Sequence, residues 1–143
     1  MERADIVLGV LAAGEGTAHT PVQVQKLFFL IDKRLGKRIS GPFFAFKPYF
    51  YGPFDRQVYV ELEDLAKKGL VEVCFDGARR TYRLTEAGQQ KGRGILATLP
   101  EEIASFIENL SSTLRQMSFG ELVSAIYRAY PEMRANSVFQ ASE

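Results

Sequence analysis

The sequence predicts an α+β fold that is mostly helical, with one small antiparallel β-hairpin. Two observations lead to this prediction. Apolar residues recur at helical spacing in several separate segments, whereas β-prone residues concentrate in residues 70–84. A chain of 143 residues with 46% hydrophobic and 24% charged residues can bury one core, so we expect a single domain over residues 1–143.

A capped helix that ends at a glycine is predicted between Asp55 and Gly69. Asp55 is a favoured N-cap residue, and Gly69 falls where helices commonly end in the left-handed conformation. The apolar residues between them repeat at helical spacing, which places them on one buried face. That face comprises Val58, Leu62, Leu65 and Ala66.

A β-hairpin follows this helix. Leu70–Phe75 is β-prone, Asp76-Gly77 favours a tight turn, and Thr81–Leu84 supplies the return strand. Thr85 can then cap a further helix. A helix followed by such a hairpin is the second half of a winged helix, so we expect a winged-helix core over residues 1–92. Winged helices bind DNA, RNA or protein, and the site must be argued separately.

Two helices are predicted ahead of this unit. Residues 4–13 are apolar on all sides and form a short buried helix that ends at Gly14. Thr20 and Gln23 form a capping box that starts a second helix, which runs to Gly36. Its apolar stripe comprises Val24, Leu27, Phe28, Ile31 and Leu35. A basic cluster at its end suits a solvated terminus as well as a binding patch, and comprises Lys33, Arg34, Lys37 and Arg38.

A C-terminal helical extension is predicted over residues 93–135. One helix spans Thr85–Ala97, a second runs from Pro100 to Met117, and a third starts at a capping box of Ser118 and Glu121. The apolar stripes of the last two helices would suit a homodimer interface, although nothing in the sequence sets the oligomeric state. We expect the tail, residues 136–143, to be loosely ordered.

Aromatic residues are densest between residues 43 and 54. Three prolines interrupt this segment, so we expect an extended stretch that ends in a tight corner at Tyr51–Phe54. The rings can fill the core, form a partly exposed surface that docks a partner, or stack on bases. They are Phe43, Phe44, Phe46, Tyr49, Phe50, Tyr51 and Phe54.

The sequence contains no recognisable catalytic or metal centre, so we expect neither enzymatic activity nor a cofactor. His19, the only histidine, precedes a helix cap and suits a surface position or a local hydrogen bond better than a ligand role. Cys74, the only cysteine, lies in an apolar strand and suits an inert buried thiol. No apolar stretch reaches the length of a membrane span, and we expect a cytoplasmic protein without membrane contact.

Charge bears on the choice between DNA and protein as the partner. Residues 1–92 hold 14 Lys and Arg against 11 Asp and Glu, and residues 93–143 hold 4 against 6, which is a mild asymmetry. The outward positions of the predicted 55–68 helix include Glu61 and Asp64, which would repel phosphates. The residues that favour DNA binding are Arg56 and Gln57 at the start of this helix and Arg79 and Arg80 at the tip of the wing.

Several motifs occur in an order that resembles the Panacea (SocA-like) domain and the related YwgA-like proteins. They are Lys26–Asp32, the Tyr51-Gly52-Pro53-Phe54 corner, Leu62–Val71, and Tyr82-Arg83-Leu84-Thr85 with Gly88. The closing Tyr130-Pro131-Glu132-Met133 with Ser137 resembles a segment of the YwgA-like proteins. The Panacea resemblance implies a small bacterial or phage-associated protein, often an antitoxin that neutralises its toxin by direct binding and sometimes a proteolytic adaptor. It implies no catalytic residues, and the YwgA-like proteins imply no settled function.

We therefore expect a non-enzymatic protein-binding module, an antitoxin-like regulator of a toxin–antitoxin system that neutralises or adapts a protein partner. The alternative is a winged-helix transcriptional regulator that binds DNA. Aromatic and arginine side chains are the commonest anchors of protein interfaces, and they converge after the aromatic segment. The predicted partner-binding residues are Tyr49, Tyr51, Phe54, Arg56 and Tyr59.

Overall fold

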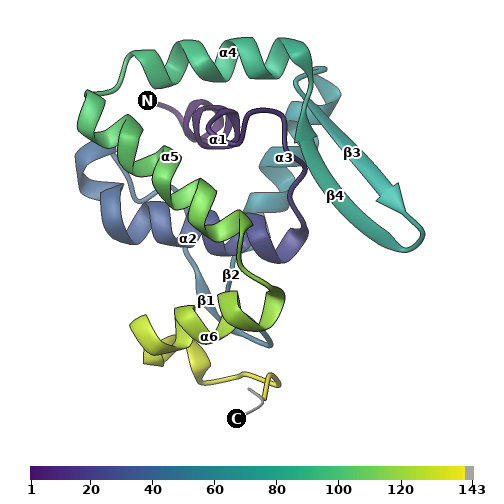
Figure 1. The fold of residues 1–143 in the computed structure, drawn as a ribbon, viewed down its shortest axis with the longest axis vertical. Helices are drawn as coiled ribbons and strands as arrows, with labels where there is room; N and C mark the ends of the chain where they lie inside the picture. The colour runs from purple at the N-terminus through teal and green to yellow at the C-terminus, as the bar shows by residue number, and fades with distance from the viewer. Residues whose placement is uncertain (141–143) are drawn as a thin grey trace.

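The computed structural model describes residues 1–140 and has an α+β fold with two antiparallel two-stranded sheets (Figure 1). None of the helices in this range is long and apolar enough to cross a bilayer. The helices are α1 (Arg3–Ala12), α2 (Pro21–Leu35), α3 (Gln57–Lys67), α4 (Glu86–Ala97), α5 (Glu101–Arg115) and α6 (Phe119–Ala129), with short 3₁₀ helices η1 (Gly36–Ile39) and η2 (Pro131–Arg134). The strands are β1 (Lys47–Tyr49), β2 (Gly52–Phe54), β3 (Val71–Asp76) and β4 (Arg79–Leu84).

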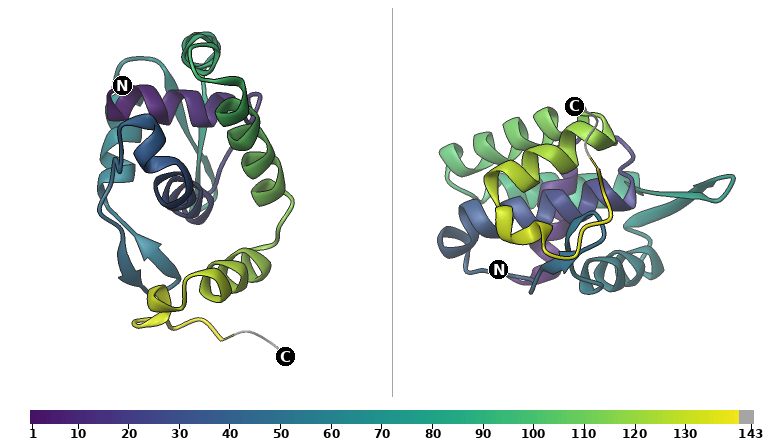
Figure 2. Two further views of the ribbon diagram at one scale, coloured as in Figure 1. Left: turned by 90° about the vertical axis from the view of Figure 1, so that its left-hand side faces the viewer. Right: turned by 90° about the horizontal axis from the view of Figure 1, so that it is seen from below.

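Helix α1 is the buried helix that the sequence predicts, and every residue from Ile6 to Ala12 is buried. Helix α4 crosses over it (Figures 1 and 2). Gly92 makes this approach possible, because a Cβ there would lie 2.6 Å from the Cβ of Ala12. The predicted division of the chain at residue 92 falls inside α4, so the C-terminal helices share the core of the N-terminal ones.

Helix α2 begins with the predicted capping box. The backbone N–H of Gln23 donates to the Thr20 hydroxyl, and the backbone N–H of Thr20 donates to the Gln23 side chain. The predicted apolar stripe is buried. Two polar residues outside it, Gln25 and Lys26, are buried as well, because the aromatic segment and the start of α3 cover a second face of α2.

Helix α3 and the β3–β4 hairpin follow the predicted order. Gly69 adopts φ +78°, the left-handed conformation expected of a C-terminal cap. The strands pair from Val71 with Leu84 to Asp76 with Arg79, so Asp76 belongs to the strand and the turn is Gly77-Ala78. The hairpin therefore extends further than the sequence predicts, and it projects from the helical body (Figure 2).

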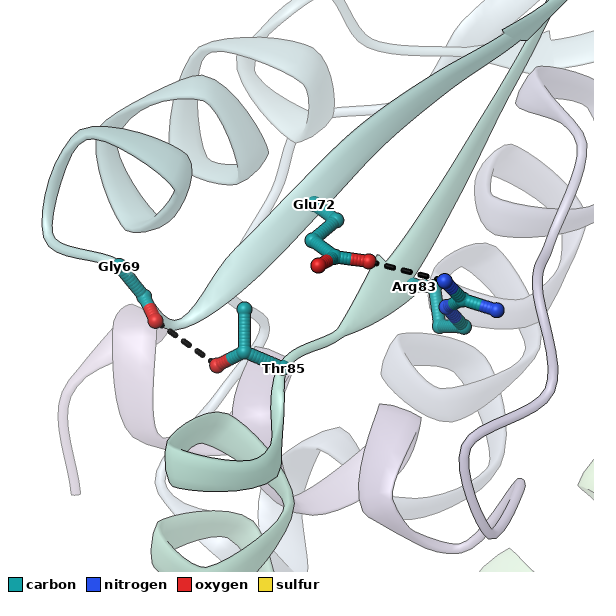
Figure 3. Close-up of polar contacts among 4 residues, drawn as sticks. All are labelled: Gly69, Glu72, Arg83 and Thr85. Carbon is teal, nitrogen blue, oxygen red and sulfur yellow. Dashed lines mark hydrogen bonds and ion pairs between the residues drawn. The ribbon is translucent and has the colours of Figure 1, made fainter.

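Two polar contacts fix the base of this hairpin (Figure 3). The Arg83 guanidinium lies 2.9 Å from the Glu72 carboxylate on the neighbouring strand. The Thr85 hydroxyl donates to the Gly69 carbonyl at 2.7 Å and accepts from the backbone N–H of Gly88 at 3.0 Å. Thr85 is therefore the N-cap of α4, as predicted, and it also ties α4 to the end of α3.

The aromatic segment contains a second hairpin that the sequence does not predict. Strand β1 pairs antiparallel with β2, with Pro48 opposite Pro53 and the tip at Phe50-Tyr51. Gly52 adopts φ +105°, which permits the tight return. The expectation of an extended stretch that ends in a corner at Tyr51–Phe54 is therefore wrong, because the chain reverses at Phe50-Tyr51 and Gly52–Phe54 forms the return strand. This hairpin lies with α6 at the end of the molecule opposite α4 (Figures 1 and 2).

The C-terminal tail is bound to this hairpin. The backbone N–H of Val138 donates to the Phe50 carbonyl at 2.9 Å, and the Asn136 side chain donates to the Pro48 carbonyl at 3.2 Å. Residues 136–138 therefore contact the hairpin through its carbonyl groups, which the sequence pattern does not reveal. Residues 141–143 lie outside the described part of the chain.

Candidate functional site

The aromatic segment divides into a buried part and an exposed part. Phe44 is 8% exposed and packs against the core, with Phe43 and Phe46 half-buried beside it. Tyr49, Phe50 and Tyr51, around the tip of the β1–β2 hairpin, are 43–47% exposed. Core filling and an exposed surface, the first two alternatives from the sequence, therefore each apply to part of the segment.

The exposed rings continue into the core as one row. Tyr49 stacks on Phe50 with centroids 4.4 Å apart and on Phe54 at 5.0 Å. Phe54 meets Tyr59 at 5.8 Å, and Tyr59 stacks on the buried ring of Tyr82 at 6.1 Å. We call these five residues the aromatic row. Because each ring is held by the next, the exposed rings lose little conformational freedom when a partner covers them.

A groove of about 670 Å³ runs beside the aromatic row. Tyr49 and Phe54 form one wall, and the exposed cations Lys47 and Arg56 lie at its edge. The one acid of the groove, Asp55, is engaged in the fold. Its two carboxylate oxygens accept backbone N–H groups, from Gln57 at 2.9 Å and from Ala45 at 2.7 Å. The groove therefore presents apolar surface and positive charge.

The side chain of Gln25, on α2, fixes the backbone of a segment that lines the groove. This side chain is 1% exposed and makes a pair of hydrogen bonds with the backbone of Asp55, both at 2.9 Å. The pair fixes the segment between β2 and α3 on helix α2. Gln25 thus positions Arg56, the next residue along the chain, without itself facing the groove.

The structure brings together four of the five predicted partner-binding residues. Tyr49, Phe54 and Tyr59 belong to the aromatic row, and Arg56 lines the adjacent groove. Tyr51 instead packs edge-on against Phe119 of α6, with ring centroids 5.3 Å apart. The sequence reasoning missed Phe50 and Lys47, and strand alternation in a β1–β2 pair would have indicated that Lys47 shares a face with Tyr49.

A buried amine lies beneath the hairpin. Lys26 is 3% exposed, and its Nζ lies 3.6 Å from the position that a Cβ on Gly52 would occupy. No carboxylate within residues 1–140 forms an ion pair with it. Burial lowers its pKa from 10.5 to about 8, because the charged form loses hydration. The fold therefore carries an uncompensated cation under the exposed aromatic surface.

The residues predicted for DNA binding do not form one cationic surface. Arg80 lies over the rings of Tyr59 and Tyr82, 5.9 Å from each centroid, and 3.8 Å from the carboxylate of Glu63. Arg80 is thus drawn back onto α3, whereas Arg79 is exposed near the tip of the β3–β4 hairpin. Arg56 and Gln57 are exposed at the start of α3, and the acids Glu63 and Asp64 are exposed along it.

His19 is buried, so of the two alternatives that the sequence favours, a surface position or a local hydrogen bond, the surface position is wrong. It is 1% exposed, and its backbone exchanges two hydrogen bonds of 2.8 Å with Tyr82. Burial, assisted by the nearby charge of Arg115, lowers the pKa of the imidazole to about 4. Cys74 is half-buried on β3. Within residues 1–140, no group of three His, Cys, Asp or Glu side chains could hold a metal ion.

Comparisons with known proteins assign no family to this chain. No family model matches it, and no match is found among curated proteins. The features of the chain that bear on its function are the aromatic row, the groove beside it and the charges on their edges.

Proposed function

We propose that this chain is a non-enzymatic module that binds a partner protein through the β1–β2 hairpin. The observation that carries the proposal is the exposed part of the aromatic row, with Tyr49 and Phe50 each 47% exposed beside a cationic groove. Clustered exposed aromatic residues are rare on proteins that have no partner, and Tyr and Arg are frequent anchors of interfaces.

The partner segment that suits this surface carries acidic and apolar side chains together. Lys47 and Arg56 are exposed cations, and the carboxylate of Asp55 is engaged by backbone N–H groups. An acidic side chain can pair with the cations while an apolar neighbour covers Tyr49 and Phe54. A basic partner would meet like charge here and would gain no ion pair.

The proposed class is a winged-helix, antitoxin-like regulator. Support for the winged-helix part comes from the order α2, α3, β3, β4 and from Thr85, which ties α4 to the end of α3. Support for the antitoxin-like part comes from the resemblance of the Lys26–Asp32 segment and of the Tyr51–Phe54 corner to the Panacea domain. In such a role the hairpin would hold and neutralise, or adapt, a toxin-like protein.

Capture of the partner from the native host tests this proposal. Tagged wild-type protein and a Y49S/F50S variant are compared after nuclease treatment, with the captured proteins identified by mass spectrometry. F75S is the matched control, because Phe75 is 69% exposed but lies on the wing. A stoichiometric protein should be captured by wild type and F75S and be reduced at least about tenfold by Y49S/F50S, since interface aromatics dominate binding energy.

Two results would overturn the proposal. Equal capture by Y49S/F50S and wild type would remove the hairpin from the interface. Absence of a stoichiometric protein after nuclease treatment, with nucleic acid recovered in a parallel capture without nuclease, would favour the alternative class.

DNA binding is the second candidate function, and the exposed cations Arg79 and Arg56 with Gln57 favour it. Glu63 and Asp64 argue against DNA binding. They are exposed on α3, the helix that would approach the major groove of DNA, where they would repel the phosphates. An R79E variant tests this alternative by its effect on DNA affinity and its salt dependence. Unchanged affinity and an unchanged salt slope would exclude the wing from DNA binding.

A further inference from the structure

A second hollow, of about 580 Å³, lies between the end of α2 and residues 42–46. It shares Pro42, Phe44 and Ala45 with the groove described above, and otherwise it has its own lining. Its volume lies within the range of roughly 300–1,000 Å³ that is typical of small-molecule sites. The proposed protein-binding function does not account for this hollow.

The inner walls of this hollow are apolar and fixed. Phe46 meets Phe29 edge-to-face with ring centroids 5.6 Å apart, and it meets Phe44 at 5.7 Å. Leu35 and Met133, both buried, complete the apolar lining. Since these rings already pack against each other, the pocket exists before any ligand enters and imposes little ordering cost.

The rim of the hollow is cationic. Lys33, Arg34, Lys37 and Arg38 all line it. Arg38 pairs with Glu102, whereas the other three form no ion pair within residues 1–140. Arg34 donates its Nε hydrogen to the Tyr130 hydroxyl at 2.8 Å, and the Lys33 Nζ lies 5.8 Å from the centre of the Phe29 ring.

The single acid in the lining does not cancel this charge at the opening. Both carboxylate oxygens of Asp32 accept backbone N–H groups, from Phe43 and Phe44, each at 2.9 Å. Burial raises the pKa of this carboxyl, and the two backbone hydrogen bonds oppose the rise. Asp32 thus serves to hold residues 43 and 44 against α2, and the unpaired cations dominate the field at the rim.

We propose that this hollow binds a small carboxylate that carries an apolar tail. The tail would cover Phe29, Phe44 and Phe46, and the carboxylate would lie at the rim near Lys33 and Lys37. A cationic ligand would meet like charge from Lys33, Arg34 and Lys37 there, and a neutral apolar ligand would gain nothing from these charges. Enclosing aromatic walls favour a small molecule over a duplex phosphate backbone, which needs an open surface.

Titration with ligands that share one tail tests the proposal directly. Octanoate, 1-octanol and octylammonium are unbranched chains of eight carbons with different head groups, and 1-naphthylacetate presents the same carboxylate on an aromatic body. Binding is followed by calorimetry, and the site is mapped by amide chemical-shift changes. Octanoate or naphthylacetate should bind, octanol should bind more weakly, and octylammonium should not bind. The shifts should fall on residues 29–46 and near Met133.

A double substitution at the rim provides the matched test of charge. K33Q/K37Q should weaken carboxylate binding by roughly tenfold, because each of two screened charge contacts contributes a few-fold in affinity. K67Q/K68Q removes the same charge from exposed positions at the end of α3, and it should leave the affinity unchanged. All four lysines are exposed, so both variants should keep the thermal stability of the wild type.

Three outcomes would overturn the proposal. The first is failure of both carboxylates to bind, and the second is binding of octylammonium as tight as that of octanoate. The third is an equal loss of affinity in K67Q/K68Q and K33Q/K37Q, which would mean that only overall charge matters. The partner-capture experiment tests the β1–β2 hairpin, and ligand titration tests the hollow. A result that overturns one proposal therefore leaves the other untouched.

Discussion

Replacing the buried Lys26 with methionine should stabilise the fold by about 3 kcal/mol at pH 7. Burial lowers the pKa of this amine from 10.5 to about 8. Each pKa unit corresponds to about 1.4 kcal/mol, so the native state bears a cost on the order of 3 kcal/mol for keeping the amine charged. Methionine has a similar length and a similar helix propensity, so K26M removes the charge while largely preserving the packing.

The pH dependence of this stabilisation follows from the direction of the shift. Below pH 8 the amine is protonated in both states, so the full cost destabilises the native wild-type protein. Between pH 8 and 10.5 the unfolded chain binds more protons than the native state, so the wild-type protein becomes more stable as pH rises. The advantage of K26M should therefore fall from about 3 kcal/mol at pH 7 to about 1 kcal/mol at pH 9.5.

Urea denaturation followed by circular dichroism at pH 7 and pH 9.5 measures both quantities. K33M is the matched control, because Lys33 is exposed on the same helix, and it should change the free energy of unfolding by less than about 0.5 kcal/mol. Buried tyrosines also titrate at high pH, but their contribution is common to wild type and variant and cancels in the difference. A K26M protein no more stable than wild type, or an advantage independent of pH, would refute this reasoning.

Three further predictions concern stability. G92A should destabilise the protein by about 1–3 kcal/mol in urea denaturation, because its Cβ would overlap that of Ala12. G94A is the control: its Cβ would meet nothing within 4 Å, so it should be neutral or stabilising in the same experiment. Stability should fall by on the order of 3 kcal/mol between pH 6.5 and 4, because the pKa of His19 is lowered to about 4 and the unfolded state binds more protons in that window. An H19L variant should lack this dependence in urea titrations across the window. T85A should cost about 1 kcal/mol by removing the cap of α4, as measured by the urea midpoint.

The helices could be predicted because their signals are local. Capping boxes at Thr20 and Ser118, the cap at Thr85 and the left-handed Gly69 each depend on a few neighbouring residues, and the structure contains all of them. The β3–β4 hairpin was predicted for the same reason, because its turn and its alternating residues lie close together in the sequence. Its length was underestimated, and its turn lies one residue later than predicted, at Gly77-Ala78.

The features that sequence reasoning missed depend on contacts between distant segments. Strands of three residues carry too little alternation to predict a β1–β2 pair, and the prolines argued against it. The burial of His19 depends on its pairing with Tyr82 in β4, and that of Lys26 on the hairpin that covers it. The attachment of the tail to Phe50 is likewise a contact across 88 residues of sequence.

The candidate site was predicted only in part, because some of its residues are brought together by contacts between distant segments. Density of aromatic residues pointed to the segment that carries Tyr49 and Phe54, and chain proximity added Arg56 and Tyr59. The contact of Tyr51 with Phe119 of α6 joins segments far apart in the sequence, so it becomes apparent only once the fold is known. The cationic hollow at the end of α2 could not be found from the sequence, since residues 42–46 and Met133 complete it.

Hydrogen–deuterium exchange of the chain with and without its captured partner tests the central claim most directly. If the β1–β2 hairpin is the interface, the partner should slow amide exchange in residues 47–59 and leave the β3–β4 hairpin, residues 71–84, unchanged. Protection of the β3–β4 hairpin and α3 without protection of residues 47–54 would contradict this account, and it would place the binding surface on the β3–β4 hairpin.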